Sequence, residues 1–310
     1  MPRLIHAIAT AAAALALTAT VTVPAVAAQR PAAPKGPEYY LALGDSLSVG
    51  DQPNAKGVTL PTDQGYADQL YAVLKRADSK LRLAKLGCPG ETTSTLNKGG
   101  ICGYKGDKRV SLTKPGGSQL AAALAFLKAH AGHVPLITID IGANDLNGCI
   151  ALGVISKIAA CLPPVFKTLE KNLAVTLVAL RAADPKATIV GMTYYVPELA
   201  DWLTGKAGQQ FAAASVILAT QFNKLLTGVY KKAGGAPVAD VFTAFDSTDM
   251  KHTVTLPHLG KLPKDVALIC KWTWECAPKP VGPNEHCNKA GYAVIAATFV
   301  ATLKKAHFPV

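Results

Sequence analysis

The stretch Tyr39-Tyr40-Leu41-Ala42-Leu43-Gly44-Asp45-Ser46-Leu47-Ser48 decides the fold that the sequence predicts. It opens with an apolar run of the length of a buried strand, and Gly44 allows a sharp turn directly after that run. Ser46 then stands at the carboxyl end of the strand, where a helix can begin. A serine there can present its hydroxyl to a crevice and keep its own N–H free for a developing anion. Because serine is also a common residue at helix starts, the turn alone does not establish a function.

Strand and helix signals alternate along the rest of the chain. Apolar runs typical of strands occupy residues 81–86, 134–141, 188–194 and 237–242, and helical spacing occupies 66–76, 120–130, 165–182, 209–231 and 289–304. This alternation predicts an α/β fold with about five parallel strands, right-handed crossovers and helices on both faces of the sheet. Ligands bind beyond the carboxyl ends of the strands in such sheets. We expect the segments 48–63, 99–117 and 246–283 to be loops or insertions that shape a pocket.

Three further segments bring polar groups to the same edge of the predicted sheet. Residues 87–93 (GCPGETT) follow the second strand, and Gly142-Ala143-Asn144-Asp145 follows the third. His286 precedes the last helix. A hydroxyl, a distant imidazole and two potential donors to an oxyanion are the minimum set for acyl transfer.

In these blocks the chain resembles the SGNH, or GDSL-type, hydrolase superfamily, and especially its secreted actinobacterial esterases and lipases with several disulfides. The blocks are Gly-Asp-Ser-Leu-Ser at 44–48, Gly-Glu-Thr at 90–92, Gly-Ala-Asn-Asp at 142–145, and His286 before Asn288 and Gly291-Tyr292. They occur in the order that the family shows and span residues 44–292. The resemblance implies a flavodoxin-like, three-layer α/β/α sandwich.

The resemblance also implies a role for each block. Ser46 would be the nucleophile and His286 the base, while the N–H groups of Ser46 and Gly90 and the side-chain amide of Asn144 would form the oxyanion hole. The chemistry suits these roles, because an imidazole can take the hydroxyl proton and later return it to the leaving alcohol. Asn144 donates without a charge, and Gly90 lets the main chain approach closely. The expected reaction is hydrolysis of carboxylic esters through an acyl-serine intermediate, with no cofactor and no metal.

The chain departs from the family pattern at the residue that orients the histidine. An acid usually stands three residues before the histidine, and here that position is Pro283. We expect a main-chain carbonyl near Pro283 to accept from the ring N–H of His286. The alternative is an acid from elsewhere, with Glu275 or Asp240 as candidates, whereas Glu285 is expected to point away from the site.

The same stretch excludes the other common architecture of serine hydrolases. The nucleophile elbow of the α/β-hydrolase fold reads G-x-S-x-G, and here Ser48 stands where the second glycine would be. The elbow of that fold also lies well into the chain, whereas Ser46 lies near the start of the exported part.

The sequence leaves the identity of the ester open. A small ester or a lipid is the expected substrate. Deacylation of a polysaccharide or a phospholipid by the same fold is the nearest alternative. The alternative that is not an enzyme is a catalytically weak, secreted basic binding protein on the same scaffold.

The N-terminus has the pattern of an export signal. Residues 1–28 carry the charged Arg3, an apolar run from Leu4 to Leu17 and the small-residue stretch Ala25-Val26-Ala27-Ala28. Residues 29–37 are expected to be a flexible lead-in and residues 38–310 the hydrolase domain. An uncleaved membrane anchor is the alternative, which Thr and Pro residues after Leu17 disfavour. The mature protein is therefore expected to be extracellular.

All cysteines lie in the part that would be exported, which favours disulfides. They are Cys88, Cys102, Cys149, Cys161, Cys270, Cys276 and Cys287. We expect Cys88 with Cys102 and Cys149 with Cys161 each to close a short loop. Cys270 can pair with either of the last two cysteines, so one cysteine stays unpaired or pairs between molecules.

The chain is basic, with 32 Lys and Arg against 20 Asp and Glu and a formal net charge of +12. The lysines are spread along the sequence, and no aromatic RNA-binding motif, zinc-finger spacing or arginine-rich arm accompanies them. We therefore expect no nucleic-acid partner. A weak contact with an anionic wall or membrane is the alternative to a simply solvated surface, and a monomer is expected.

Overall fold

The computed structural model describes residues 36–310, apart from residues 106–107 and 112–115 and the side chains of 104–115. The expected export signal at 1–28 and nearly all of the lead-in at 29–37 lie outside the described residues. Both therefore stay predictions. Within the part of the chain that is described, no helix is both long enough and apolar enough to cross a membrane.

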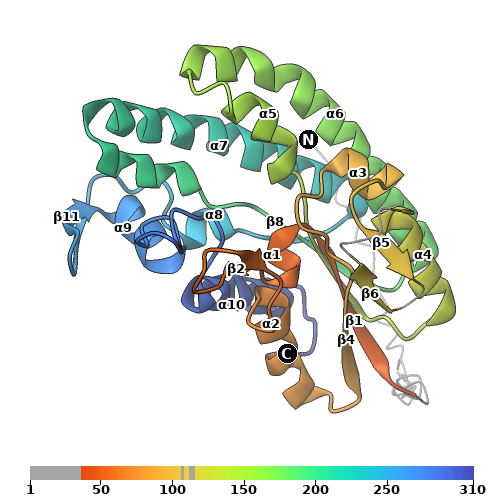
Figure 1. Ribbon diagram of the computed structural model, residues 1–310. Coiled ribbons are helices and arrows are strands. Elements are labelled where there is room, and N and C mark those ends of the chain that lie inside the picture. Colours follow the sequence, from red (N-terminus) through yellow and green to blue (C-terminus); the bar gives the residue numbers. More distant parts are fainter. Residues whose placement is uncertain (1–35, 106–107, 112–115) are drawn as a thin grey trace, which may run out of the picture. The chain divides into compact units, whose positions relative to one another are not determined.

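A parallel sheet of five strands forms the centre of the described unit (Figure 1). The strands lie in the order β4 (Leu81–Lys85), β1 (Glu38–Gly44), β7 (Leu136–Asp140), β8 (Thr188–Met192) and β9 (Val238–Ala239). Every neighbouring pair is parallel, so the predicted sheet is confirmed. In chain order the strands read 2-1-3-4-5, the arrangement of flavodoxin-like folds. The order reverses next to β1, and there a crevice opens at the carboxyl ends of the strands.

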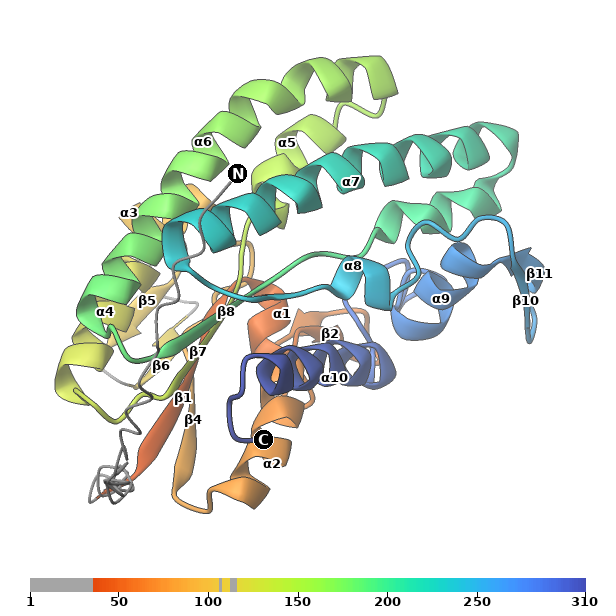
Figure 2. The ribbon, with the colours of Figure 1, turned by 180° about the vertical axis from the view of Figure 1, so that it is seen from behind.

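Helices cover both faces of this sheet, as Figures 1 and 2 show, so the predicted three-layer α/β/α sandwich is confirmed. One layer contains α2 (Tyr66–Ala77) and α10 (Lys289–Lys305), and the other contains α4 (Gln119–Ala129), α6 (Ile155–Ala183) and α7 (Lys206–Gly234). Because both faces are covered, the inner strands are mostly apolar and buried, as expected of a parallel sheet, with Thr138 and Asp140 of β7 as buried polar residues.

Helix α6 begins ten residues earlier than the 165–182 helix that the sequence predicts, and it runs through Pro163 and Pro164. Prolines inside a helix lack the N–H for the main-chain hydrogen bond, so they usually mark a helix start or a break. Here contacts with other parts of the chain stabilise the first turns of α6. The disulfide between Cys149 and Cys161 ties them to the preceding helix, and Ile158 and Leu162 are buried.

The remaining elements are short and lie between the main strands and helices. They are α1 (Ser46–Val49), β2 (Gln52–Pro53), β3 (Thr59–Leu60), α3 (Thr93–Lys98), β5 (Gly103–Lys105), β6 (Lys108–Ser111), η1 (Ala143–Leu146), α5 (Asn147–Ile150), η2 (Pro197–Thr204), α8 (Val241–Ala244), β10 (Thr253–Leu256), β11 (Gly260–Pro263) and α9 (Lys264–Trp272). Three two-stranded ribbons therefore fall in the segments expected to be loops, and α9 is a helix that the sequence analysis did not predict.

Disulfides join Cys88 to Cys102, Cys149 to Cys161 and Cys270 to Cys276. The two predicted loop-closing pairs are thus present, and the open choice for Cys270 is decided in favour of Cys276. Cys287 is unpaired and buried. Among the described residues, no group of three or more His, Cys, Asp or Glu side chains is arranged to hold a metal ion.

Candidate active site

Ser46 lies where the sequence predicts it, directly after β1 and at the first residue of α1. Gly44 has a φ of 135°, and a Cβ there would collide with the main-chain oxygen of Asp140, so only glycine fits this turn. Asp45 caps the helix by accepting a hydrogen bond of 3.0 Å from the Leu47 N–H. Ser48 is buried and its hydroxyl donates to the Asp45 carbonyl at 2.7 Å. These contacts fix the turn and leave the Ser46 side chain at its outer edge.

The imidazole of His286 reaches Ser46 from the other end of the chain. Its Nε2 lies 2.9 Å from the Ser46 Oγ, although the two residues are 240 positions apart in the sequence. Ser46 begins α1, so its own N–H has no acceptor one turn earlier in the helix. A hydroxyl, a base and a free N–H therefore meet at one point.

Asn284, not Pro283, orients the histidine. The side-chain oxygen of Asn284 lies 2.9 Å from the His286 Nδ1 and also accepts the main-chain N–H of His286 at 3.1 Å. The main-chain N–H of His286 can only donate, so the Asn284 atom that faces it is the amide oxygen. The same oxygen faces Nδ1, and an oxygen of this kind only accepts, so Nδ1 must carry the ring proton. Nε2 is then unprotonated and can accept from Ser46. The Asn284 amide nitrogen donates to the hydroxyl of Thr59 at 2.8 Å, which holds the amide in this orientation.

The prediction of a carbonyl near Pro283 is therefore wrong, and so is the alternative of a distant acid. Asp240 caps α8 and accepts from the hydroxyls of Thr193 and Thr243 instead. The signal for Asn284 was present in the sequence. An asparagine often accepts the N–H two residues later in an Asx turn, and here that turn also brings the amide oxygen to the ring.

His286 has no carboxylate partner among its hydrogen bonds in the described chain. Burial lowers the pKa of the His286 imidazole to about 4, because the low-dielectric surroundings disfavour the charged ring. The ring is thus neutral at neutral pH, as a base must be before it accepts a proton.

Asn144 lies beside these two residues, at the end of β7 and in η1. Its amide nitrogen donates to the Glu91 carbonyl at 3.0 Å, and its amide oxygen accepts from the Asn147 side chain at 3.0 Å. An amide nitrogen carries two hydrogens, so one N–H of Asn144 remains for a ligand. The neighbouring Asp145 accepts from the N–H and the hydroxyl of Thr93, which ties this turn to the one that follows β4.

Gly90 is less closely placed than the sequence predicts. It is exposed with a φ of 77° and does not line the pocket that holds Ser46 and His286. The main-chain carbonyl of its neighbour Glu91 accepts from Asn144, so the peptide between Glu91 and Thr92, one unit after Gly90, lies next to the amide. Its part in an oxyanion hole stays a prediction.

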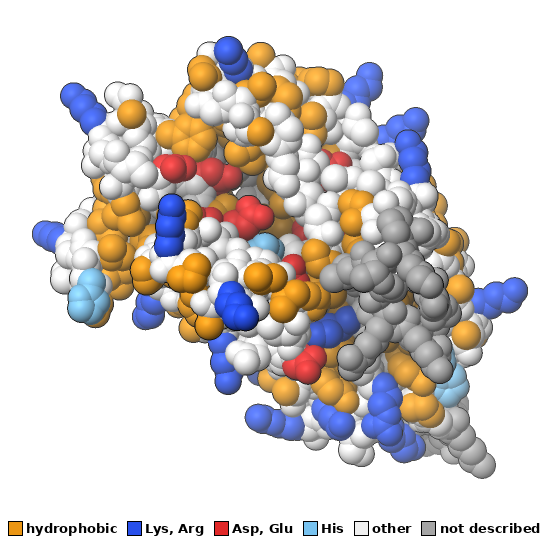
Figure 3. All heavy atoms as spheres, viewed as in Figure 1, with side chains coloured by type: hydrophobic (Ala, Val, Ile, Leu, Met, Phe, Trp, Pro, Cys, Tyr) orange, Lys and Arg blue, Asp and Glu red, His pale blue; other side chains and the backbone are white. Residues whose placement is uncertain are grey.

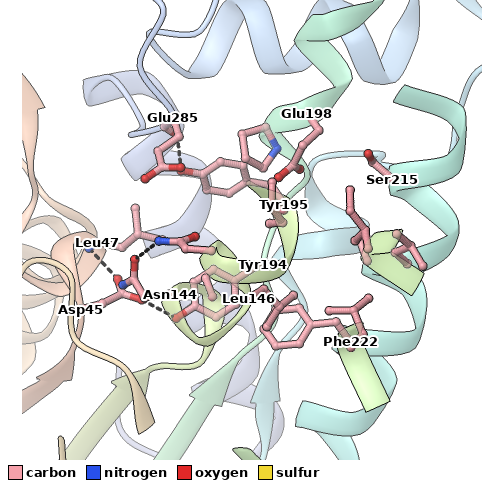
Figure 4. Close-up of a pocket in the computed structure, with 18 of the residues that line it drawn as sticks. Asp45, Leu47, Asn144, Leu146, Tyr194, Tyr195, Glu198, Ser215, Phe222 and Glu285 are labelled. Atoms are coloured by element: carbon pink, nitrogen blue, oxygen red, sulfur yellow. Dashed lines mark hydrogen bonds between the residues drawn. The ribbon is translucent and has the colours of Figure 1, made fainter. Parts of the chain in front are cut away.

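A pocket extends away from Ser46, and Figure 4 shows part of its lining. It is lined by Asp45, Ser46, Leu47, Ala143, Asn144, Leu146, Asn147, Ile150, Ile158, Leu162, Tyr194, Tyr195, Pro197, Glu198, Phe211, Ser215, Leu218, Ala219, Phe222, Glu285 and His286. More than half of these side chains are apolar. Those contributed by α5, α6 and α7 are Ile150, Ile158, Leu162, Phe211, Leu218, Ala219 and Phe222. None comes from 48–63 or 246–283, so the expectation that the loops there shape the pocket is wrong for its lining.

Three carboxylates accompany the apolar lining: Asp45, which accepts from the Leu47 N–H and the Tyr194 hydroxyl, and the two glutamates Glu198 and Glu285. Glu285 lines the pocket rather than pointing away from it as predicted, and its main-chain carbonyl accepts from the Tyr195 hydroxyl at 2.7 Å. Burial, together with the nearby charge of Glu285, raises the pKa of Glu198 to about 7. Figure 3 shows acidic side chains gathered in the hollow of a surface that is otherwise rich in Lys and Arg.

A serine hydroxyl hydrogen-bonded to a neutral imidazole, at the carboxyl ends of a doubly wound parallel sheet, is the arrangement that the motif resemblance implies for an SGNH hydrolase. A family model described as the GDSL-like Lipase/Acylhydrolase family matches residues 42–294. The chain belongs to this family, as the motif resemblance implied.

Solved structures share the fold at low sequence identity. An extracellular lipase from Streptomyces rimosus is 18% identical with a TM-score of 0.52, and the match covers 86% of this chain and 99% of that one. A phospholipase A1 from Streptomyces albidoflavus is 18% identical with a TM-score of 0.51, covering 86% and 100%. A catalytic mutant of an acetylxylan esterase from Geobacillus stearothermophilus is 16% identical with a TM-score of 0.50, covering 86% and 95%. No curated protein sequence matches significantly.

Proposed function

We propose that the protein is a secreted esterase or lipase that hydrolyses carboxylic esters through an acyl-serine intermediate. The observation that carries the proposal is the 2.9 Å contact between the Ser46 hydroxyl and the unprotonated nitrogen of His286, at the mouth of an apolar pocket. A hydroxyl becomes an effective nucleophile only when a base is placed to take its proton. The pocket offers an apolar part of the ester a dry binding surface.

The reaction follows from this geometry in two halves. The Ser46 oxygen bonds to the acyl carbon while Nε2 of His286 takes the hydroxyl proton. The tetrahedral oxyanion, stabilised by the Ser46 N–H and the Asn144 amide, then collapses. The bond to the alcohol breaks, and the imidazolium gives its proton to the leaving oxygen. Water repeats the sequence on the acyl-serine, which releases the acid and restores the hydroxyl.

Asn284 sets how the base responds to pH. Because the base must be neutral, kcat/KM falls as the pH drops through the pKa of His286, which is about 4 in the free protein. Activity should therefore persist in mild acid. In Asn284→Asp a carboxylate faces Nδ1 and favours the charged ring, so the acid limb should move up by about 1–3 pH units.

The pH profile of kcat/KM measures this shift. Asn288→Asp is the matched control, because Asn288 caps α10 through the N–H groups of Ala290 and Gly291 and does not bond to the ring. An unchanged acid limb in Asn284→Asp, with the protein folded, would show that Asn284 does not orient the base.

The carboxylates of Glu198 and Glu285 favour a neutral ester over an anionic one, which supports a simple ester or lipid ahead of a phospholipid. We expect a monoacylglycerol to be hydrolysed faster than the same molecule carrying a phosphate on its glycerol. Since Glu198 ionises near pH 7, its share of this preference should grow as the pH rises through that value.

Glu198→Gln should reduce the preference on the order of fivefold at alkaline pH, a modest effect because both charges are partly solvated. Glu170→Gln, on the outer surface of α6, is the control. Equal preference in wild type and Glu198→Gln at every pH would remove Glu198 from head-group selection.

The proposed secretion has its own test. Expression of the full chain in an actinobacterial host should release protein to the medium with an N-terminus near Gln29, as residues 25–28 predict. Protein that stays with the cells and keeps residues 1–28 would favour the anchored alternative.

A further inference from the structure

The pocket has two chemically different sides with respect to the reacting groups. Glu285 adjoins His286 in the chain, and Figure 4 shows Glu285 and Glu198 on one side of the pocket and Leu146 and Phe222 on the other. His286 must protonate the leaving alcohol. Because Glu285 is its neighbour in the chain, we place the alcohol on the side of Glu285 and Glu198. The acyl chain then enters the apolar side, between α5, α6 and α7. This assignment rests on the proposed function.

The apolar side ends at two leucines. Leu162 of α6 and Leu218 of α7 line the pocket, and the same two residues also line a second cavity between α6 and α7. Behind them, the rings of Phe166 and Phe222 stack with centroids 6.3 Å apart. Phe222 lines the inner pocket and Phe166 lines the outer cavity. The aromatic pair, like the two leucines, therefore lies between the pocket and the cavity.

We propose that Leu162 and Leu218 form the end wall of the acyl-binding pocket and set the longest acyl chain that the protein accepts. The inner pocket holds the chain from the carbonyl carbon to the wall. The outer cavity, which Leu225 also lines, is a continuation that the wall closes off. An acyl chain that would pass the wall must displace two packed side chains, and this opposes binding.

The end wall lies in a part of the structure where substitutions should not disturb the main hydrophobic core. Cys149, Ile158 and Leu162 form a buried hydrophobic cluster of their own, distinct from the main core around the sheet. Leu218 packs against this cluster, and the disulfide between Cys149 and Cys161 closes it. Shortening a leucine here should therefore leave the sheet and the pair Ser46–His286 in place.

The experiment is a panel of p-nitrophenyl esters with straight acyl chains from acetyl to palmitoyl. In Leu162→Ala and Leu218→Ala the optimum should move to longer chains, and the ratio of kcat/KM for long over short chains should rise roughly tenfold or more. Leu162→Phe should shift the optimum to shorter chains. Leu225→Ala, at a residue that lines the outer cavity and not the inner pocket, should keep the wild-type profile and serves as the matched control.

The outcomes separate this inference from the proposed function. A wild-type profile in both wall variants, or an equal shift in Leu225→Ala, would overturn the inference while the esterase stands. If the wild type hydrolyses no ester, the proposed function fails. In that case, calorimetric binding of straight-chain alcohols of increasing length to the same variants tests whether Leu162 and Leu218 limit the chain length that the pocket accepts. If Leu162→Ala binds longer alcohols than the wild type does, the inference is supported. If the longest alcohol bound is the same in both, the inference is overturned.

Discussion

Ser46→Ala and His286→Ala are each expected to lower kcat for a p-nitrophenyl ester by on the order of 10⁴-fold or more. Ser46 supplies the atom that bonds to the acyl carbon, and His286 is the base that hydrogen-bonds to it at 2.9 Å. Without the hydroxyl no acyl-enzyme can form, and without the imidazole the hydroxyl stays protonated. Initial rates under saturating substrate measure the effect.

The two substitutions should act as a unit. Once either residue is lost, the other can no longer contribute to catalysis. The double variant should therefore be about as slow as the slower single variant. Ser215→Ala controls for the loss of a hydroxyl from the same pocket, because the Ser215 hydroxyl bonds to a carbonyl of its own helix. Losses that multiply in the double variant would mean that the two groups work independently.

Asn144→Ala is the second large effect that we expect. It should lower kcat by roughly 10²–10³-fold with little change in KM, because the amide hydrogen bonds to an oxyanion that exists only after attack. Thermal unfolding should change little, since the Asn144 side chain is half-buried and its hydrogen bonds within the described residues go to the Glu91 carbonyl and to the Asn147 side chain at the start of α5.

Asn147→Ala tests whether the amide must be held in place. Asn147 contacts the amide oxygen of Asn144 and leaves the donor itself intact, so its loss should cost less than that of Asn144. A kcat that is unchanged in Asn144→Ala would exclude this residue from the oxyanion hole, and Gly90 and Ser46 would then be the remaining donors.

The sheet and the convergence of Ser46 with His286 could be predicted from the sequence for one physical reason. Parallel strands covered on both faces must be apolar throughout, so they are visible as short apolar runs. The polar residues that directly follow such runs must then meet at one edge. Ser46 after β1 and Asn144 after β7 illustrate this, because their strands are direct neighbours in the sheet.

The partner of His286 was not predicted because the expected partner was an acid or a main-chain carbonyl, placed by its spacing from the histidine. Asn284 meets the same geometric need through an Asx turn, which depends on local main-chain conformation rather than on spacing in a motif. The residue type therefore differs from the expected acid while the acceptor oxygen occupies an equivalent position on the ring.

The lining of the pocket could not be predicted because part of it belongs to turns of α6 that lie before the amphipathic pattern at 165–182. The predicted helix begins at residue 165, so Ile158 and Leu162 had no predicted structure. Pro163 and Pro164 do not indicate the interior of a helix. A disulfide and a local hydrophobic cluster stabilise the earlier turns, and such tertiary contacts are not visible in a helical pattern. The acyl wall therefore became visible only in the folded structure.

Covalent labelling with a fluorophosphonate, located by peptide mass spectrometry, tests the central claim most directly. The phosphonyl group reacts only with a serine that a base activates. We predict one label, on the peptide that contains Ser46, in wild type and Ser215→Ala, and none in Ser46→Ala or His286→Ala. A label on another serine, or equal labelling of His286→Ala, would contradict the account.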